Sequence, residues 1–541
     1  MKITGHLIDI RQKSIFDAAI TIEGTKIVSI EPAVNVADQY LLPGFVDAHV
    51  HIESSMVVPS EFARMAVVHG TVATVSDPHE IGNVLGVAGV EYMIENGKQV
   101  NFKFNFGAPS CVPATTFETA GAEITPAEVE YLLKKPEVKY LAEMMNWPGV
   151  LYNDPVVYEK LDIAKRLGKP IDGHAPGLRG EQAEQYIKAG ISTDHECFTK
   201  EEALDKLKHG MKIAIREGSA AKNFEALIAL LADYPDMIMF CSDDKHPDNL
   251  VEGHINQLVQ RALAKGHDLY HVLQAACINP VEHYSLEVGT LREGDPADFI
   301  VIDHPDSFGI KATYINGEQV SEGSKSLISR VENAVINNFN CEPVSPGQLS
   351  IKATGAKLNV IEALDGQLIT NCLEVPVTTD AEDNAISNTE TDILKMVVVN
   401  RYAPAPPAIA FIKSFGLKEG AIASCVGHDS HNIIAVGVDD ETIAEAINLI
   451  IEAKGGVSAV SAKQKLLVPL PVAGIMSADD GYAVAEAYSQ IDALSKQMGS
   501  TLVSPFMSLS FMALLVIPSL KLSDLGLFDG DQFAFKPLFI H

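Results

Sequence analysis

Two histidines stand one residue apart at the end of an apolar segment, in the sequence LLPGFVDAHVHIESSM (residues 41–56). The run from Leu41 to Val46 has the composition of a fully buried strand. Because a strand alternates its side chains between two faces, His49 and His51 are expected to point the same way, with Glu53 after them. Imidazole serves both as a metal ligand and as an acid–base catalyst, so the pair is a candidate for either chemistry.

Other polar side chains follow apolar segments in the same manner. They are Glu143, His174, His195 and the neighbours Asp243 and Asp244. A single histidine at the end of a strand is more often structural than a ligand, but four histidines together with Glu143 and Asp243 at one edge favour a shared site. Nitrogen and oxygen ligands without a thiolate suit Zn, Mn, Fe or Co.

Eight such apolar segments recur along the chain, separated by helical patterns such as residues 154–168 and 181–190. The segments begin near positions 41, 71, 102, 139, 169, 191, 211 and 237. Eight strands that alternate with helices over roughly 250 residues predict an α/β fold, a (β/α)8 barrel of the TIM type. An open doubly wound sheet is disfavoured, because no GxGxxG or GxxxxGK sequence follows any strand. In a barrel of this type, the carboxyl ends of the strands carry the chemistry, and the candidate residues lie there.

The order HxH, His, His and Asp along such a barrel resembles the amidohydrolase superfamily. Within it the chain is most similar to the adenine deaminase family. The similarity lies in six segments spread over nearly the whole chain: HVHIESSM, SDPHEIGNV, GHAPGL, STDHECF, CSDDKHPDNL and, in the C-terminal third, GHDSHNIIAVG.

The resemblance implies a domain arrangement as well. A small β-domain would be built from both flanks of the barrel, residues 1–40 and 285–342, with the segment VGTLREGDPADFIVID (288–303) closing it. The barrel would occupy residues 41–284. Residues 343–541 mix strand-like and helix-like patterns and predict a C-terminal α+β domain, in which the polar, acidic segment 376–392 is a surface connection.

The same resemblance implies hydrolytic deamination of adenine to hypoxanthine and ammonia, by a hydroxide that bridges two divalent metal ions. Mn or Fe is favoured over Zn. The implied metal ligands are His49, His51, Glu143, His174, His195 and Asp243. Many binuclear members of the superfamily bridge their metals with a carboxylated lysine, whereas this chain offers Glu143, whose two oxygens suit ions roughly 3.5–4 Å apart. Asp243 resembles the aspartate that binds one metal and accepts the proton of the hydroxide.

Attack on C6 of adenine breaks the aromaticity of the ring, so N1 must gain a proton. The candidate donors or substrate-binding residues, which lie just beyond strand ends, are His79, Glu80 and His246. In the C-terminal third, His428, Asp429 and His431 lie close together, and the sequence does not decide between a local turn and a role in the site. Trp147 fits either the purine pocket or simple packing.

The composition of the chain limits which partners it can bind and where in the cell it is expected. A formal net charge of −30 argues against a nucleic-acid partner, because phosphates are neutralised by cationic side chains. No apolar run approaches the roughly 20 residues that span a bilayer, and the N-terminal MKITGHLIDIRQK shows no secretory apolar region. Seven cysteines without a CxxC pair indicate neither a disulfide framework nor a thiolate zinc site. We expect a cytoplasmic homo-oligomer that acts on a small molecule.

Two alternatives stay open at this point. A cyclic amidohydrolase of the dihydroorotase or hydantoinase type would use the same metal chemistry, although such enzymes generally carry the bridging lysine. A non-catalytic scaffold built on the same barrel would be expected to lack ligands, whereas all six ligand positions are filled in this sequence.

Overall fold

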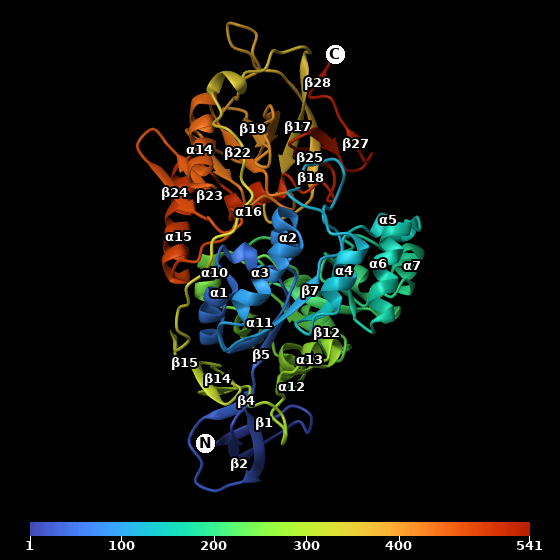
Figure 1. The fold of residues 1–541 in the computed structure, drawn as a ribbon, viewed down its shortest axis with the longest axis vertical. Coiled ribbons are helices and arrows are strands. Elements are labelled where there is room, and N and C mark those ends of the chain that lie inside the picture. Colours follow the sequence, from blue (N-terminus) through green and yellow to red (C-terminus); the bar gives the residue numbers. More distant parts are fainter.

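A parallel barrel occupies the middle of the computed structural model, which describes residues 1–541 (Figure 1). Its eight strands are β5 (Phe45–Val50), β6 (Thr71–Ser76), β7 (Lys103–Ala108), β8 (Val138–Met144), β9 (Ile171–Gly173), β10 (Thr193–Asp194), β11 (Lys212–Arg216) and β12 (Ile238–Cys241). Strands β5 to β9 and β10 to β12 form two parallel sheets. Backbone hydrogen bonds from Asp243 to His49 (3.0 Å) and from Ser192 to Ile171 (2.8 Å) join the two sheets into a ring. The predicted barrel is confirmed.

The barrel strands are short, and several of them, such as β12 with the sequence IMFC, are continuous in apolar residues because both of their faces are covered. All six residues of β6, TVATVS, are buried. The predicted helical segments form α6 (Pro155–Arg166) and α7 (Gly180–Lys188) outside the ring. Asp154 caps α6 by accepting hydrogen bonds from the backbone of Val156 and Val157.

A mixed sheet below the barrel joins the two flanks of the chain (Figure 1). From the N-terminal flank come β1 (Lys2–Asp9), β2 (Ser14–Glu23), β3 (Lys26–Pro32) and β4 (Tyr40–Pro43). The other flank supplies β13 (Phe299–Ile302), β14 (Ile310–Ile315), β15 (Glu318–Glu322) and β16 (Lys325–Ser326). In this sheet β4 pairs with both β1 and β13. Leu41 and Leu42 therefore belong to the small sheet, and the first barrel strand begins at Phe45 rather than at position 41.

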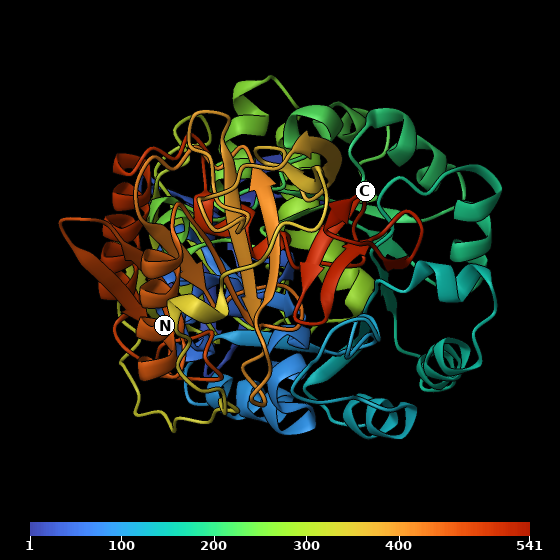
Figure 2. The same cartoon turned by 90° about the horizontal axis from the view of Figure 1, so that it is seen from above.

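The C-terminal domain lies over the opposite end of the barrel (Figures 1 and 2). Its main sheet includes β17 (Lys357–Ala363), β18 (Thr370–Pro376), β19 (Ile393–Val399), β20 (Ala408–Lys413), β21 (Ala421–Ser424), β22 (Ile433–Gly437), β23 (Gly456–Val460) and β24 (Lys465–Pro469), with β28 (Phe539–Ile540) paired to β17. The helices are α14 (Asp440–Ala453), α15 (Gly481–Gln497) and α16 (Pro505–Phe511). The polar segment 376–392 connects β18 to β19.

One apolar cluster runs from the barrel into the C-terminal domain. It contains Ile81 and Val84 from α2 (His79–Leu85) of the barrel together with Phe511 and Leu514 from the C-terminal domain. The two units are therefore held together by shared burial of apolar surface, and side chains of both can form one fixed site.

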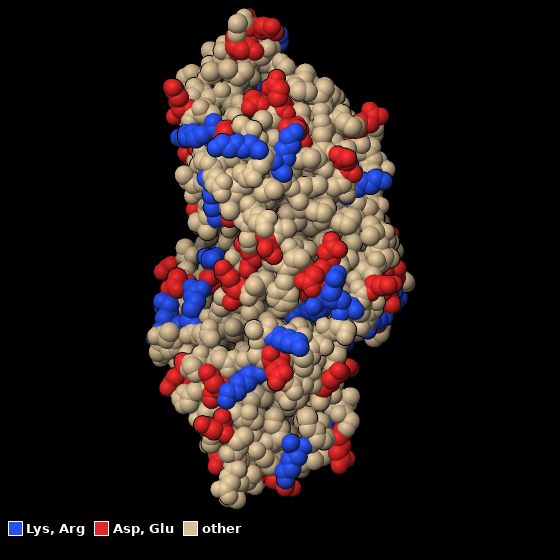
Figure 3. Space-filling model, turned by 90° about the vertical axis from the view of Figure 1, so that its left-hand side faces the viewer, with Lys and Arg blue, Asp and Glu red and all other residues tan.

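The surface and the helices bear on the possible partners. On the face seen in Figure 3, Lys and Arg side chains are interspersed with Asp and Glu. None of the helices combines the length and the apolar character that crossing a membrane requires.

Candidate metal centre and active site

The strand ends predicted to carry chemistry meet at one end of the barrel, under the C-terminal domain. His49 lies in β5 and His51 just after it, Glu143 lies near the end of β8, and the others follow β9, β10 and β12. All six predicted ligands are buried: His49, His51, Glu143, His174, His195 and Asp243. The fold thus places them where TIM-type barrels carry out their chemistry.

His49 and His51 point into the same space, as strand alternation requires. Their Nε2 atoms are 3.1 Å apart, and the two rings are nearly perpendicular. Oδ1 of Asp243 lies 3.6 Å from Nε2 of His49 and 3.4 Å from Nε2 of His51. Two imidazole nitrogens and a carboxylate oxygen therefore converge on one point, which is how a divalent cation is commonly held.

Glu143 stands between two groups of histidines. Its Oε2 lies 2.9 Å from His174 Nδ1 and 3.1 Å from His195 Nε2, whereas its Oε1 lies 3.6 Å from His51 Nε2. Burial raises the pKa of Glu143, but the imidazoles of His174 and His195 outweigh it and hold the pKa well below its usual range. An ionised carboxylate with one oxygen toward each group has the arrangement that a bridge between two cations needs.

Arg216 and Glu196 belong to the site but were missed in the sequence. Arg216, at the end of β11, donates through Nη1 to Asp243 Oδ2 (2.6 Å) and forms a two-armed pair with Glu196. Burial raises the pKa of Asp243, but Arg216 together with the neighbouring histidines His49 and His51 outweighs it and holds the pKa well below its usual range. Arg216 ends the apolar run IAIR, and Glu196 directly follows the predicted ligand His195, so their positions at strand ends were the signal that could have found them.

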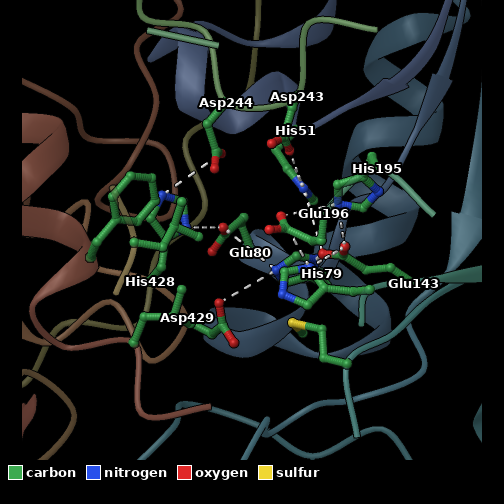
Figure 4. A pocket seen from close by; sticks show the side chains of 15 residues that line it. His51, His79, Glu80, Glu143, His195, Glu196, Asp243, Asp244, His428 and Asp429 are labelled. Carbon is green, nitrogen blue, oxygen red and sulfur yellow. Dashed lines mark hydrogen bonds and ion pairs between the residues drawn. The ribbon is translucent and has the colours of Figure 1, made fainter. Parts of the chain in front are cut away.

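A second group of polar residues adjoins the six predicted metal ligands, hereafter the metal-binding cluster, and includes residues of the C-terminal domain (Figure 4). Glu80 of α2 is hydrogen-bonded through one oxygen to His428 Nδ1 and through the other to His431 Nε2. His79 places Nε2 3.5 Å from Glu80 and 3.6 Å from Asp429 Oδ1. The GHDSHN segment therefore reaches across to the barrel instead of making only local hydrogen bonds.

Asp244 lies towards the site, although regular strand alternation after Asp243 would turn its side chain away. Asp243 has a left-handed φ of 54°, which breaks the alternation at the end of β12. Asp244 consequently also lines the cavity, accepts a 2.5 Å hydrogen bond from Ser54, and lies 3.7 Å from His428 Nε2.

Two other candidates are not brought to the cavity. His246 precedes α10 (Pro247–Glu252), and its ring packs edge-on against Tyr488 at 4.8 Å. Burial there lowers the pKa of His246 to about 3, so the ring is neutral. Trp147 starts α5 (Trp147–Leu151) and packs on the apolar core outside the cavity lining.

The cavity between the two domains is small, with about 20 Å³ of space for the centre of a water-sized molecule. Its barrel side carries the imidazoles and carboxylates described above. Leu368, Phe511 and Leu514 of the C-terminal domain supply an apolar wall. The cavity therefore has polar groups on its barrel side and apolar side chains on the side of the C-terminal domain.

The donor set fits divalent metal. Four imidazoles and two carboxylates are gathered without any thiol, and overlapping subsets of them lie within 4.8 Å of one another. The Nε2 atoms of His49 and His51 lie 3.1 Å apart, close enough for both lone pairs to be directed at one cation. The cluster therefore suits a divalent metal site, whose ion the ligand types leave undetermined.

Comparison with known proteins agrees with this geometry. A model of the amidohydrolase family matches residues 40–320, and a model of the adenine deaminase C-terminal domain matches residues 367–534. Adenine deaminases from Salinibacter ruber and from Sulfurovum sp. are each 54% identical to this chain, and one from Methanosarcina acetivorans is 51% identical. Each alignment covers 99% of this chain and 99% of the relative. This chain belongs to the adenine deaminase family.

Membership of the family accounts for the two-part site. The match to the amidohydrolase family contains the six metal-binding candidates in the barrel. The match to the C-terminal domain contains the apolar wall and the GHDSHN segment, which complete the cavity.

Proposed function

We propose that the protein converts adenine and water to hypoxanthine and ammonia. The observation that carries this proposal is the cavity itself, in which a metal-binding barrel cluster faces a domain matched by the adenine deaminase C-terminal model. In the reaction a C6–O bond forms, the C6–N bond breaks, and the amino group leaves as ammonia. Hypoxanthine formation from adenine by purified protein tests the proposal, and absence of the product from metal-loaded protein would contradict it.

We propose that His49, His51, Glu143, His174, His195 and Asp243 hold two divalent ions, with Mn or Fe preferred to Zn. When bound, such ions lower the pKa of a water molecule and offset developing negative charge. Support comes from the two oxygens of Glu143, which face different histidines. Metal-free protein reconstituted with each ion in turn, with activity and bound metal measured together, identifies the preferred ion and the number required.

Asp243 is the proposed acceptor of the proton that the attacking water loses, and it passes that proton to the departing amine. Its Oδ2 is held by Arg216, while its Oδ1 faces the histidine pair. Arg216 thus fixes the orientation of the carboxylate and leaves one oxygen for proton transfer.

Protonation of N1 falls to the residues that line the cavity beside this cluster. Glu80 and His79 lie there, and His428 and His431 fix both oxygens of Glu80. His246 lies outside the cavity lining, which leaves Glu80 and His79 as the candidates that the geometry favours. Glu80→Gln and His79→Gln, compared for kcat at equal metal content, distinguish the two.

Free adenine is the proposed substrate, in preference to adenosine or a nucleotide. The enclosed cavity is small, and no Lys or Arg lines it to receive a phosphate. Comparable turnover of adenosine would contradict this proposal.

The alternatives differ in measurable ways. The alignment with an adenine deaminase over 99% of both chains weighs against a dihydroorotase or hydantoinase. Ring opening of a hydantoin by the purified protein tests that alternative. A metal content near zero would favour a scaffold. We also propose a homo-oligomer without nucleic-acid or membrane partners, which light scattering of the purified protein and binding assays test.

A further inference from the structure

Two adjacent residues of the C-terminal domain, His428 and Asp429, line the cavity across from the metal-binding cluster. Figure 4 shows them on the side opposite Glu143 and His195. Both are buried, with 3% of their surface exposed. They lie beyond the residues matched by the amidohydrolase model, so they belong to the part of the site that the C-terminal domain adds to the barrel.

His428 carries a hydrogen-bond donor without an acceptor. Its Nδ1 is bonded to Glu80, whereas its buried Nε2 has no partner and lies 3.7 Å from the nearest carboxylate oxygen, Oδ1 of Asp244. Burial lowers the pKa of His428, but the carboxylates of Glu80 and Asp244 raise it to about 9 overall. Both ring nitrogens therefore carry hydrogen at neutral pH, and the Nε2–H remains to be satisfied.

Asp429 carries an acceptor without a donor. Its Oδ1 lies 3.6 Å from His79 Nε2, and its buried Oδ2 has no partner. Buried polar atoms are nearly always paired in native proteins, so two orphaned atoms on neighbouring residues of one cavity wall point to a ligand. Phe511 stacks on the His428 ring, with ring centres 5.4 Å apart, and offers an aromatic surface beside them.

We propose that His428 and Asp429 bind the edge of adenine that lies across the ring from the reacting amino group, with Asp429 accepting from N9–H and His428 donating to N3. This inference rests on the proposed function. N3 and N9 flank one carbon on the side of the purine opposite C6, so a purine with C6 at the metal-binding cluster presents this edge to the C-terminal domain. An acceptor and a donor side by side on the protein match a donor and an acceptor side by side on the base.

The proposal explains selectivity for the free base. N9 carries hydrogen in adenine but a ribosyl carbon in adenosine, so a nucleoside would leave the Asp429 carboxylate buried without a donor. Sites built to bond a polar group reject analogues that lack it by up to about 10⁴–10⁵-fold. Asp429 is therefore a specificity-determining residue, and His428 is its partner.

The contact to N3 is tested with 3-deazaadenine, in which carbon replaces N3. For the metal-loaded wild-type protein we expect kcat/KM to be about 10–100-fold lower than for adenine, the usual loss when a charged donor is left unpaired. In His428→Ala this ratio should be at least about tenfold smaller than in the wild type, because the donor is gone. The ratio cancels any general loss of activity in the variant, and comparing the ratio between the wild type and the variant cancels the intrinsic difference in reactivity between the two bases.

The contact to N9–H is tested with 9-methyladenine. The wild-type protein should discriminate against it by about 10³-fold or more, and Asp429→Ala should reduce this discrimination at least tenfold. Ser430→Ala is the matched control, because Ser430 is buried in the same segment but lies outside the cavity lining. It should keep both ratios and the metal content of the wild type.

The outcomes separate the two proposals. Metal-loaded wild type that does not convert adenine would overturn the proposed function and this inference with it. Suppose the wild type converts adenine, but the variants discriminate against 3-deazaadenine and 9-methyladenine as strongly as the wild type does. That result would overturn this inference alone. If a variant does not fold, the wild-type protein still tests the inference. Turnover of 9-methyladenine by the wild type at a rate comparable to that of adenine would exclude a carboxylate that accepts from N9–H.

Discussion

Replacing Glu143 with glutamine isolates the bridging role proposed for its carboxylate. The side chain keeps its shape, but one of its two oxygens becomes an NH₂ group, which cannot accept a cation. In either orientation one side loses its anionic ligand, since Oε2 faces His174 and His195 while Oε1 faces His51. Removing a residue that only hydrogen-bonds to a metal ligand typically lowers metal affinity by about 10–100-fold. Loss of a direct ligand should therefore weaken the binding of one of the two ions by at least that factor.

The assay is metal analysis after dialysis against a chelator whose strength just spares the wild-type protein. We expect about two ions per chain in the wild type and about one in Glu143→Gln, with kcat/KM reduced by at least about 100-fold. Glu196→Gln is the matched control. Glu196 lies 3.6 Å from His174 and 3.5 Å from His195, but both of its oxygens are occupied by Arg216. This variant should keep both ions and lose stability instead.

Full occupancy and normal turnover in Glu143→Gln would refute the bridge. Loss of metal from Glu196→Gln equal to that from Glu143→Gln would show that negative charge near the histidines, rather than ligation by Glu143, determines the occupancy.

Three other perturbations have defined outcomes. Asp243→Asn should lower kcat by roughly 10²–10⁴-fold while some metal stays bound, because it removes the proton acceptor. Asp244→Asn should lower kcat much less. If Asp244→Asn lowered kcat more than Asp243→Asn at equal metal content, Asp243 would not be the base. Lys206→Met should destabilise the fold by about 3–5 kcal/mol in urea unfolding, because it leaves buried carboxylates without their cation, whereas the exposed Lys208→Met on the same helix should leave the unfolding free energy unchanged. Burial lowers the pKa of His246 to about 3, so below the usual histidine pKa of about 6.5 the unfolded chain binds a proton that the folded chain does not. Stability should therefore fall as pH drops from 6.5 towards 3, and His246→Leu should make that fall shallower; equal slopes in the two proteins would contradict the buried neutral ring.

The barrel and its ligand positions could be predicted because their signals are local. Most barrel strands lie in short apolar runs, and the predicted ligands lie near the carboxyl ends of β5, β8, β9, β10 and β12. Strand alternation alone placed His49 and His51 on one face. The same rule failed at Asp243, where a left-handed backbone conformation interrupts the alternation.

The remaining parts of the site depend on contacts between distant segments. His246 follows a barrel strand as the ligands do, but the start of α10 turns its ring towards Tyr488, and no local pattern specifies that direction. Phe511 and Leu514 resemble ordinary core residues in the sequence, and only the packing of the C-terminal domain makes them a cavity wall. The link from Glu80 to His428 joins residues far apart in the chain, which no periodicity reveals.

The small sheet below the barrel constrains the order in which the chain becomes folded during synthesis. Strand β4 needs β13 as its second neighbour, and the whole barrel is translated between them. At about 5–20 residues per second, β13 leaves the ribosome on the order of ten to fifty seconds after β4. For that interval β4 presents an uncovered edge, the kind of surface that pairs with other chains. Yield of the native protein should thus depend on how fast translation proceeds and on what covers that edge while the ribosome completes the barrel.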